Sequence, residues 1–211
     1  MFEIKKTRTL ATYKNYLSML KIFFRDYIGR EDLIKDFKFP QQQFKPKTLP
    51  SNKDLKTFYD ALPSIKYKII FLALISSGLR ISELLSVDII KEDRMLIPKS
   101  HDGKTKKGWI SFYNIETENL LKNYQDNPFN TSRNTVAHVF KEVAVKTNIK
   151  ITPQTLRLIF AREMSLKKVP DRYIDAFCGR VPSSILAKHY SDFSPEVLKK
   201  IYDSADLKYF G

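Results

Sequence analysis

Apolar residues recur every three or four positions along most of this chain, and this spacing constrains the fold more than any other feature. The first series runs from Leu10 to Tyr27 and stops near Gly29. Side chains at this spacing line one face of an α-helix, so the series predicts an amphipathic helix. The chain is therefore expected to be mainly helical. The same spacing predicts further helices near residues 31–37, 51–62, 67–77, 81–85, 116–124, 131–147, 153–166, 171–177 and 194–203.

Residues 95–113 depart from helical spacing. Two short apolar runs, 95–98 and 109–113, lie on either side of a polar, lysine-rich loop that contains Gly103 and Gly108. Such a pair of runs around a glycine-containing loop is typical of a β-hairpin. We therefore predict an α+β fold class that is mainly α, with a small β-hairpin or sheet.

Prolines divide the chain near its first quarter. Pro40, Pro46 and Pro50 lie among glutamines and lysines, a composition that interrupts helices and strands and suits an exposed linker. The part before them holds only two predicted helices, too little chain for an independent core. We therefore predict that residues 1–45 belong to a larger helical module, or to a bundle completed by other parts of the chain. Residues 46–211 would form the main domain.

The charge balance narrows the class of partner. Lysine and arginine number 37 against 23 aspartates and glutamates, which gives a formal net charge of +14. This favours a polyanionic partner such as DNA, RNA or an anionic membrane over a neutral small molecule. No apolar run reaches the roughly 18 residues that span a bilayer, and no secretory signal opens the chain. Because Cys178 is the only cysteine, neither an internal disulfide nor a thiolate zinc site can form, and we expect a cytoplasmic protein.

Three segments contain the residues best suited to chemistry. The first is Gly-Leu-Arg-Ile-Ser-Glu-Leu at 78–84, and the second is Thr-Pro-Gln-Thr-Leu-Arg at 152–157. The third is Gly-Arg-Val-Pro at 179–182, followed by the pair His189-Tyr190. Each segment alone would be weak evidence. Their order and spacing, with the predicted hairpin between the first two, resemble the signature boxes of the tyrosine recombinases, the phage-integrase-like family.

This resemblance implies how the two parts of the chain are used. Residues 49–203 are similar to the catalytic domain, so residues 46–211 are expected to form it. The first forty residues resemble the last helices of the core-binding domain that clamps DNA, so residues 1–45 are expected to be its C-terminal part. The third box, with Ala-Lys-His-Tyr at 187–190, looks most like integrases of archaeal viruses and plasmids.

The resemblance also implies a catalytic mechanism. Tyr190 would attack the scissile phosphate, form a 3′-phosphotyrosyl link and release a 5′-hydroxyl, with no metal ion, cofactor or ATP. Arg80 and Arg157 would hold the phosphate. A hairpin lysine would protonate the leaving oxygen, and Lys104 is preferred to Lys106 because Lys-Thr just before the second strand matches the usual placement. The expected catalytic residues are Arg80, Lys104, Gln154, Arg157, Arg180 and Tyr190.

The residue types suit this chemistry independently of the resemblance. Cleaving a phosphodiester without a metal requires fixed positive charge around the non-bridging oxygens, and a planar guanidinium meets two oxygens at once. A tyrosine hydroxyl, with an ordinary pKa of about 10, needs a nearby cationic cluster or a base to react. Two positions depart from the family pattern. Gln154 replaces a His or Lys and cannot transfer a proton at neutral pH, and Arg180 replaces a His or Trp, so the general base is unidentified.

Structural interpretations stay open for several of these residues. Arg80 could cap a helix end or pair with Glu83, and Arg157 could lie at the edge of the core. The hairpin lysines could belong to a solvated loop. Tyr202 is a rival nucleophile, although no box precedes it at the right distance.

The expected function is a site-specific DNA recombinase or integrase that binds duplex DNA and self-associates there as a tetrameric synapse. Residues 194–211 are expected to be the segment that packs on a neighbouring protomer. A non-catalytic DNA-binding relative of the fold is an alternative, motivated by Gln154 and Arg180, and would bind DNA without covalent capture. A type IB topoisomerase is another, and would relax supercoils without a specific site.

Overall fold

The computed structural model describes residues 9–41, 48–99, 109–180 and 191–210. The chain divides into two compact units, residues 1–48 (the N-terminal unit) and residues 49–211 (the C-terminal unit). The described parts are mostly helical and include one three-stranded antiparallel sheet, so the predicted fold class is confirmed. No helix in these parts is long and apolar enough to cross a membrane.

One long helix dominates the N-terminal unit. Helix α2 (Leu10–Ile22) begins after the N-cap Thr9 and continues as the π-helical turn η1 (Phe23–Ile28). The helix ends at Gly29, whose left-handed backbone, with φ 69°, suits a glycine. The prediction of a second helix in this unit, at residues 31–37, is wrong. Only a single 3₁₀ turn, η2 (Glu31–Leu33), forms there, because a helix this short gains little from propagation.

The C-terminal unit contains most of the helices, and α8 and α9 have the bounds predicted from the sequence. In the described parts of this unit the helices are α3 (Asn52–Asp60), α4 (Ile65–Ser77), α5 (Ile81–Leu84), α6 (Ile115–Lys122), α7 (Arg133–Thr147), α8 (Pro153–Leu166), α9 (Asp171–Phe177) and α11 (Pro195–Ser204).

A small sheet is formed by the residues between α5 and α6. Its strands are β1 (Val87–Ile90), β2 (Met95–Pro98) and β3 (Ser111–Phe112), in the order β1-β2-β3 and all antiparallel. Met95 sets the register, because it pairs with Ile90 on one side and with Phe112 on the other. The predicted strand pair is therefore present as β2 and β3. Strand β1 was not predicted from the sequence.

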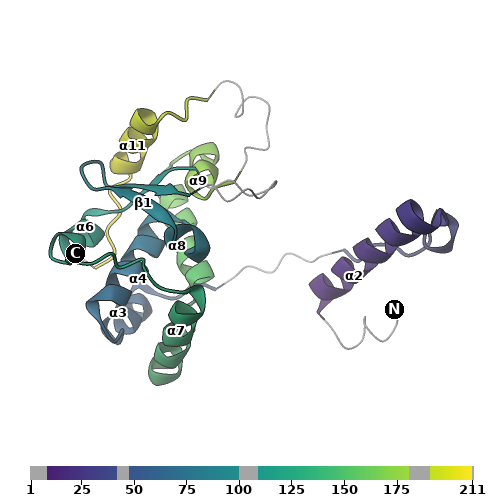
Figure 1. The fold of residues 1–211 in the computed structure, drawn as a ribbon, viewed down its shortest axis with the longest axis horizontal. Helices are drawn as coiled ribbons and strands as arrows, with labels where there is room; N and C mark the ends of the chain where they lie inside the picture. Colours follow the sequence, from purple (N-terminus) through teal and green to yellow (C-terminus); the bar gives the residue numbers. More distant parts are fainter. Residues whose placement is uncertain (1–8, 42–47, 100–108, 181–190, 211) are drawn as a thin grey trace. The chain divides into compact units, whose positions relative to one another are not determined.

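Helix α4 is the centre of the main hydrophobic core. Every residue from Ile69 to Ser77 is buried, and the helix packs against α8 and α6 (Figure 1). A helix buried on all sides has no polar face, which explains the continuous apolar run in its sequence. Its last turn leads directly into the first of the three boxes.

A second core joins the sheet to the C-terminal helices. Phe112 of β3, Phe177 of α9 and Tyr202 of α11 form a group of tilted and edge-to-face rings with centroid distances of 5.4 to 6.2 Å. Phe160 of α8 joins it through an edge-to-face contact with Phe177 at 6.2 Å. Because α11 contributes Leu198 and Tyr202 to this core, it is fixed on its own unit.

The C-terminal tail also packs on its own unit. The Tyr209 hydroxyl donates to the Ile75 carbonyl at 2.9 Å, and the Phe210 ring lies 4.7 Å from that of Tyr59. The Glu116 carboxylate accepts the backbone N–H groups of Tyr209 and Phe210 at 2.9 and 2.6 Å. The expectation that residues 194–211 pack on a neighbouring protomer stays a prediction. Within the single chain, the side chains of Leu198, Tyr202 and Leu207 are buried against their own unit.

Candidate active site

Arg80 lies at the junction between α4 and α5. Its backbone N–H donates to Oε2 of Glu83 at 2.8 Å, and its Nη1 donates to Oε1 of the same carboxylate at 2.5 Å. The Arg80 side chain remains 29% exposed, whereas that of Glu83 is 12% exposed. The ion pair considered from the sequence is present. It orients the guanidinium without removing it from solvent.

Gly78 makes this junction possible. Its backbone is left-handed, with φ 67°, at the end of α4. A Cβ atom at this position would lie 2.3 Å from Cδ1 of Phe160, so the turn approaches α8 more closely than a side chain permits. The glycine of the first box therefore brings that box against α8, the helix that begins within the second box.

Arg157, in the second box, is buried and connects that box to the first box and to the residue before the third. Its Nη1 donates to the Gly78 carbonyl at 2.9 Å, and its Nη2 donates to the Cys178 carbonyl. Oε2 of Glu83 lies 3.7 Å from Nη1, so one carboxylate faces both box arginines. Burial lowers the pKa of the Arg157 guanidinium, although an arginine remains charged in proteins. The first box, the second box and the residue before the third thus meet at one side chain.

Arg180 and Gln154 are both exposed near this centre. Arg180 follows Gly179 at the end of α9 and pairs with Oδ1 of Asp175 at 3.1 Å, with half of its side chain exposed. Gln154 lies in the first turn of α8, after the N-cap Thr152. An exposed amide here can donate to or accept from a bound oxygen, but it carries no charge.

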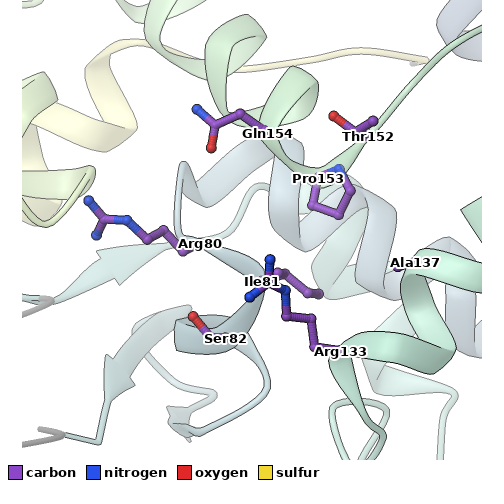
Figure 2. Close-up of a pocket in the computed structure, with 8 residues that line it drawn as sticks. All are labelled: Arg80, Ile81, Ser82, Arg133, Ala137, Thr152, Pro153 and Gln154. Carbon is purple, nitrogen blue, oxygen red and sulfur yellow. The ribbon is translucent and has the colours of Figure 1, made fainter. Parts of the chain in front are cut away.

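A pocket with a volume of about 300 Å³ opens between Arg80 and the first turn of α8 (Figure 2). The first turn of α7 also lines this pocket, and its Arg133 side chain extends toward the start of α5. Arg133 was not among the residues expected from the sequence, because no box contains it. The lining residues are Arg80, Ile81, Ser82, Arg133, Ala137, Thr152, Pro153 and Gln154.

Two of the expected catalytic residues, Lys104 and Tyr190, lie outside the described residues, as does the reserve candidate Lys106. The rival nucleophile Tyr202 is 2% exposed, and its hydroxyl donates to the Ser76 carbonyl at 2.9 Å. Burial raises the pKa of Tyr202 far above its ordinary value. A hydroxyl that is buried, bonded and hard to ionise cannot attack DNA, so Tyr202 is excluded as a nucleophile.

Sequence comparisons point to one family. Residues 50–196 match the model of the phage integrase family. The tyrosine recombinase XerA of Pyrococcus furiosus is 28% identical over 186 residues, which cover 77% of this chain and 64% of the relative. The XerA of Saccharolobus solfataricus is 33% identical over 118 residues, which cover 52% of this chain and 40% of the relative. The chain thus spans less than two thirds of the length of either relative.

Solved structures share the fold. The Tn1549 transposon integrase in complex with circular intermediate DNA has a TM-score of 0.66 and 18% identity, covering 94% of this chain and 80% of that one. A λ integrase dimer bound to a COC′ core site has a TM-score of 0.63 and 14% identity, covering 88% and 77%. A crystal structure of XerA recombinase has a TM-score of 0.52 and 18% identity, covering 95% and 84%.

Proposed function

The chain belongs to the phage integrase family, and from this premise we propose that it is a site-specific DNA recombinase that cleaves and rejoins strands through a 3′-phosphotyrosyl intermediate. The observation that carries the proposal is the position of Arg157, whose guanidinium joins the first box to the carbonyl two residues before Arg180. Arg157 and Arg180 are thereby gathered near the partly exposed Arg80. A phosphodiester is the group that such a cluster suits best.

The proposed reaction is the one that the resemblance to tyrosine recombinases implies. The Tyr190 hydroxyl gives its proton to solvent water and its oxygen attacks the scissile phosphorus, the bond from phosphorus to the 5′-oxygen breaks, and Lys104 gives that oxygen a proton. Arg80, Arg157 and Arg180 stabilise the charge that develops on the non-bridging oxygens. Attack by another 5′-hydroxyl reverses these steps and joins the strands, so the phosphotyrosyl bond preserves the energy of the original linkage. Gln154 contributes a hydrogen bond to the phosphate but no proton transfer.

The proposal extends to domains and partners. Residues 1–45 would be the C-terminal part of a core-binding domain that clamps duplex DNA, and residues 46–211 the catalytic domain. Recombination between two sites would require four protomers on DNA. The similar Tn1549 integrase in complex with circular intermediate DNA and the λ integrase dimer bound to a core site support a DNA partner. The residues of the third box resemble those of integrases from archaeal viruses and plasmids. We therefore further propose that the protein is such an integrase and acts in the host cytoplasm.

Covalent capture tests the proposal directly. The purified protein would be incubated, without ATP, with nicked duplexes whose sequence is randomised around the nick, so that a cleaved short strand diffuses away and traps the adduct. Adducts would be resolved on a denaturing gel, and the captured DNA sequenced to identify the site. We expect an adduct that Tyr190→Phe abolishes, that Tyr202→Phe preserves, and that yields a consensus sequence.

A non-catalytic DNA-binding role is the second candidate, favoured by one observation. Gln154 occupies the exposed first turn of α8, where a protonatable side chain would be expected in an active recombinase. This candidate predicts a mobility shift with duplex DNA and no adduct under any condition of the capture experiment. The native mobility-shift gel and the denaturing capture gel together separate the two functions.

A further inference from the structure

We propose that Arg133 binds a backbone phosphate of the DNA next to the phosphate held by Arg80. The proposal rests on the proposed function, since it takes the Arg80 phosphate as its reference point. Arg133 is the first residue of α7, is exposed, and lines the pocket opposite Arg80 and Gln154 (Figure 2). The two arginines come from different segments and both line the pocket, with the Arg80 guanidinium directed away from Arg133 (Figure 2).

The charge in this pocket is not balanced. None of the described residues that line it is acidic. Arg80 shares its charge with Glu83, whereas no described carboxylate pairs with Arg133. A cationic hollow that lacks an acidic partner attracts an anion, and the fixed fork of a guanidinium suits phosphate oxygens. The unneutralised cation of the pocket is therefore Arg133.

The surroundings of Arg133 suit an anion as well. The pocket includes the first turns of α7 and α8, and the N-terminus of a helix carries partial positive charge on its free N–H groups. The hydroxyls of Ser82 and Thr152 and the amide of Gln154 add neutral donors. One phosphate at Arg80 would leave the Arg133 side of the pocket for the next phosphate along the strand.

The position of Arg133 is rigid enough for binding. One and two turns further along α7, Val136, Val139 and Phe140 are buried in the main core, and the Phe140 ring centroid lies 5.5 Å from that of Phe58. The Ser132 hydroxyl caps the helix by accepting the Thr135 N–H at 3.0 Å. The backbone of Arg133 is thus fixed before DNA arrives, which reduces the entropy lost on binding.

The salt dependence of binding tests this assignment. A fluorescein-labelled duplex of mixed sequence would be titrated by anisotropy at several KCl concentrations, in a Tyr190→Phe background that prevents covalent capture. The slope of log K against log salt counts the phosphates that the protein neutralises, at about 0.9 per phosphate. We expect Arg133→Ala to reduce the slope by roughly 1, on every duplex sequence tested, and Arg133→Lys to retain it.

Lys146 provides the matched control. It is an exposed cation in the last turn of the same helix, and we expect Lys146→Ala to leave the slope unchanged. An unchanged slope in Arg133→Ala would overturn the proposal. So would an equal reduction in Lys146→Ala, which would indicate a diffuse field, or a changed sequence preference at constant slope, which would indicate a base contact.

The outcomes also separate this proposal from the proposed function. If the wild-type protein forms no adduct, the recombinase function fails, while the slopes still report whether Arg133 contacts phosphate. If a Tyr190-dependent adduct forms but Arg133→Ala keeps the wild-type slope, the assignment of Arg133 alone is lost.

Discussion

At the scale of single residues, Arg157 combines a charge suited to phosphate with a structural role. Its guanidinium is buried and donates to the carbonyls of Gly78 and Cys178. A guanidinium has five N–H donors, so these two bonds do not use all of them. Arg80 differs, because it is partly exposed and bonded to a side chain. The two arginines should therefore respond differently to substitution, although both belong to the proposed site.

We predict that Arg157→Ala destabilises the fold by about 1–3 kcal/mol for each carbonyl left without a donor. Arg157→Lys should recover only part of this, because a single ammonium group cannot reproduce the fork. Arg80→Ala should lower the free energy of unfolding by no more than about 1 kcal/mol. Urea unfolding followed by circular dichroism measures all three. Equal stability of the Arg157→Ala and wild-type proteins would contradict the hydrogen bonds described.

Arg80→Ala and Arg157→Ala should both impair covalent capture. Removing one donor from a developing oxyanion typically costs a factor of about 10² to 10³ in rate. We therefore predict that Arg80→Ala forms the Tyr190 adduct at least about a hundredfold more slowly while it remains folded. Single-turnover adduct formation measures the rate. A wild-type rate in Arg80→Ala would remove this arginine from the catalytic set.

At the scale of elements, the contact of the α4–α5 junction with α8 holds the site together. Gly78 has a left-handed backbone and no room for a Cβ atom because of the Phe160 ring. We predict that Gly78→Ala lowers the free energy of unfolding by more than the roughly 1–3 kcal/mol of backbone strain alone. Gly78→Ala combined with Phe160→Leu should cost less than the sum of the two single variants, since the smaller side chain relieves the clash. Additive costs in urea unfolding would indicate that no such clash exists.

The C-terminal tail is a second segment held by contacts within its own unit. Phe210 stacks near Tyr59 and Phe71, and Glu116 accepts two backbone N–H groups of the tail. We predict that Phe210→Ala lowers the free energy of unfolding by about 1–2 kcal/mol, as expected for a partly buried aromatic ring. Val145→Ala, at an exposed position on α7, should change it by less than about 0.5 kcal/mol. Equal effects of the two would mean that the tail is not docked on its own unit in solution.

At the scale of the whole molecule, net charge governs affinity. The formal charge of +14 favours any duplex, whatever its sequence. If the protein neutralises about six or more phosphates, affinity for a mixed-sequence duplex should fall by on the order of 10³ or more between about 50 and 200 mM salt. Fluorescence anisotropy measures this decrease. Affinity that is independent of salt would contradict a phosphate-dominated interface.

Local sequence patterns determined most of the helices. The bounds of α8 and α9 follow from Thr152, Pro153 and the spacing of apolar residues, and these signals act within a few positions of the chain. The tertiary structure decided the rest. Strand β1 was missed because a strand of four residues is defined by its pairing with β2, and the helix predicted at 31–37 was too short to form without packing.

The candidate site shows the same division. The boxes alone singled out Arg80 and Arg157 as candidates, because their residue types and order can be read from the sequence. Only the fold decided that Arg157 bonds to the carbonyls of Gly78 and Cys178, and that Arg133 lines the pocket with Arg80. Periodicity and capping depend on neighbours within one or two helical turns. Contacts between distant segments depend on how buried helices such as α4 pack, and a single sequence does not record that packing.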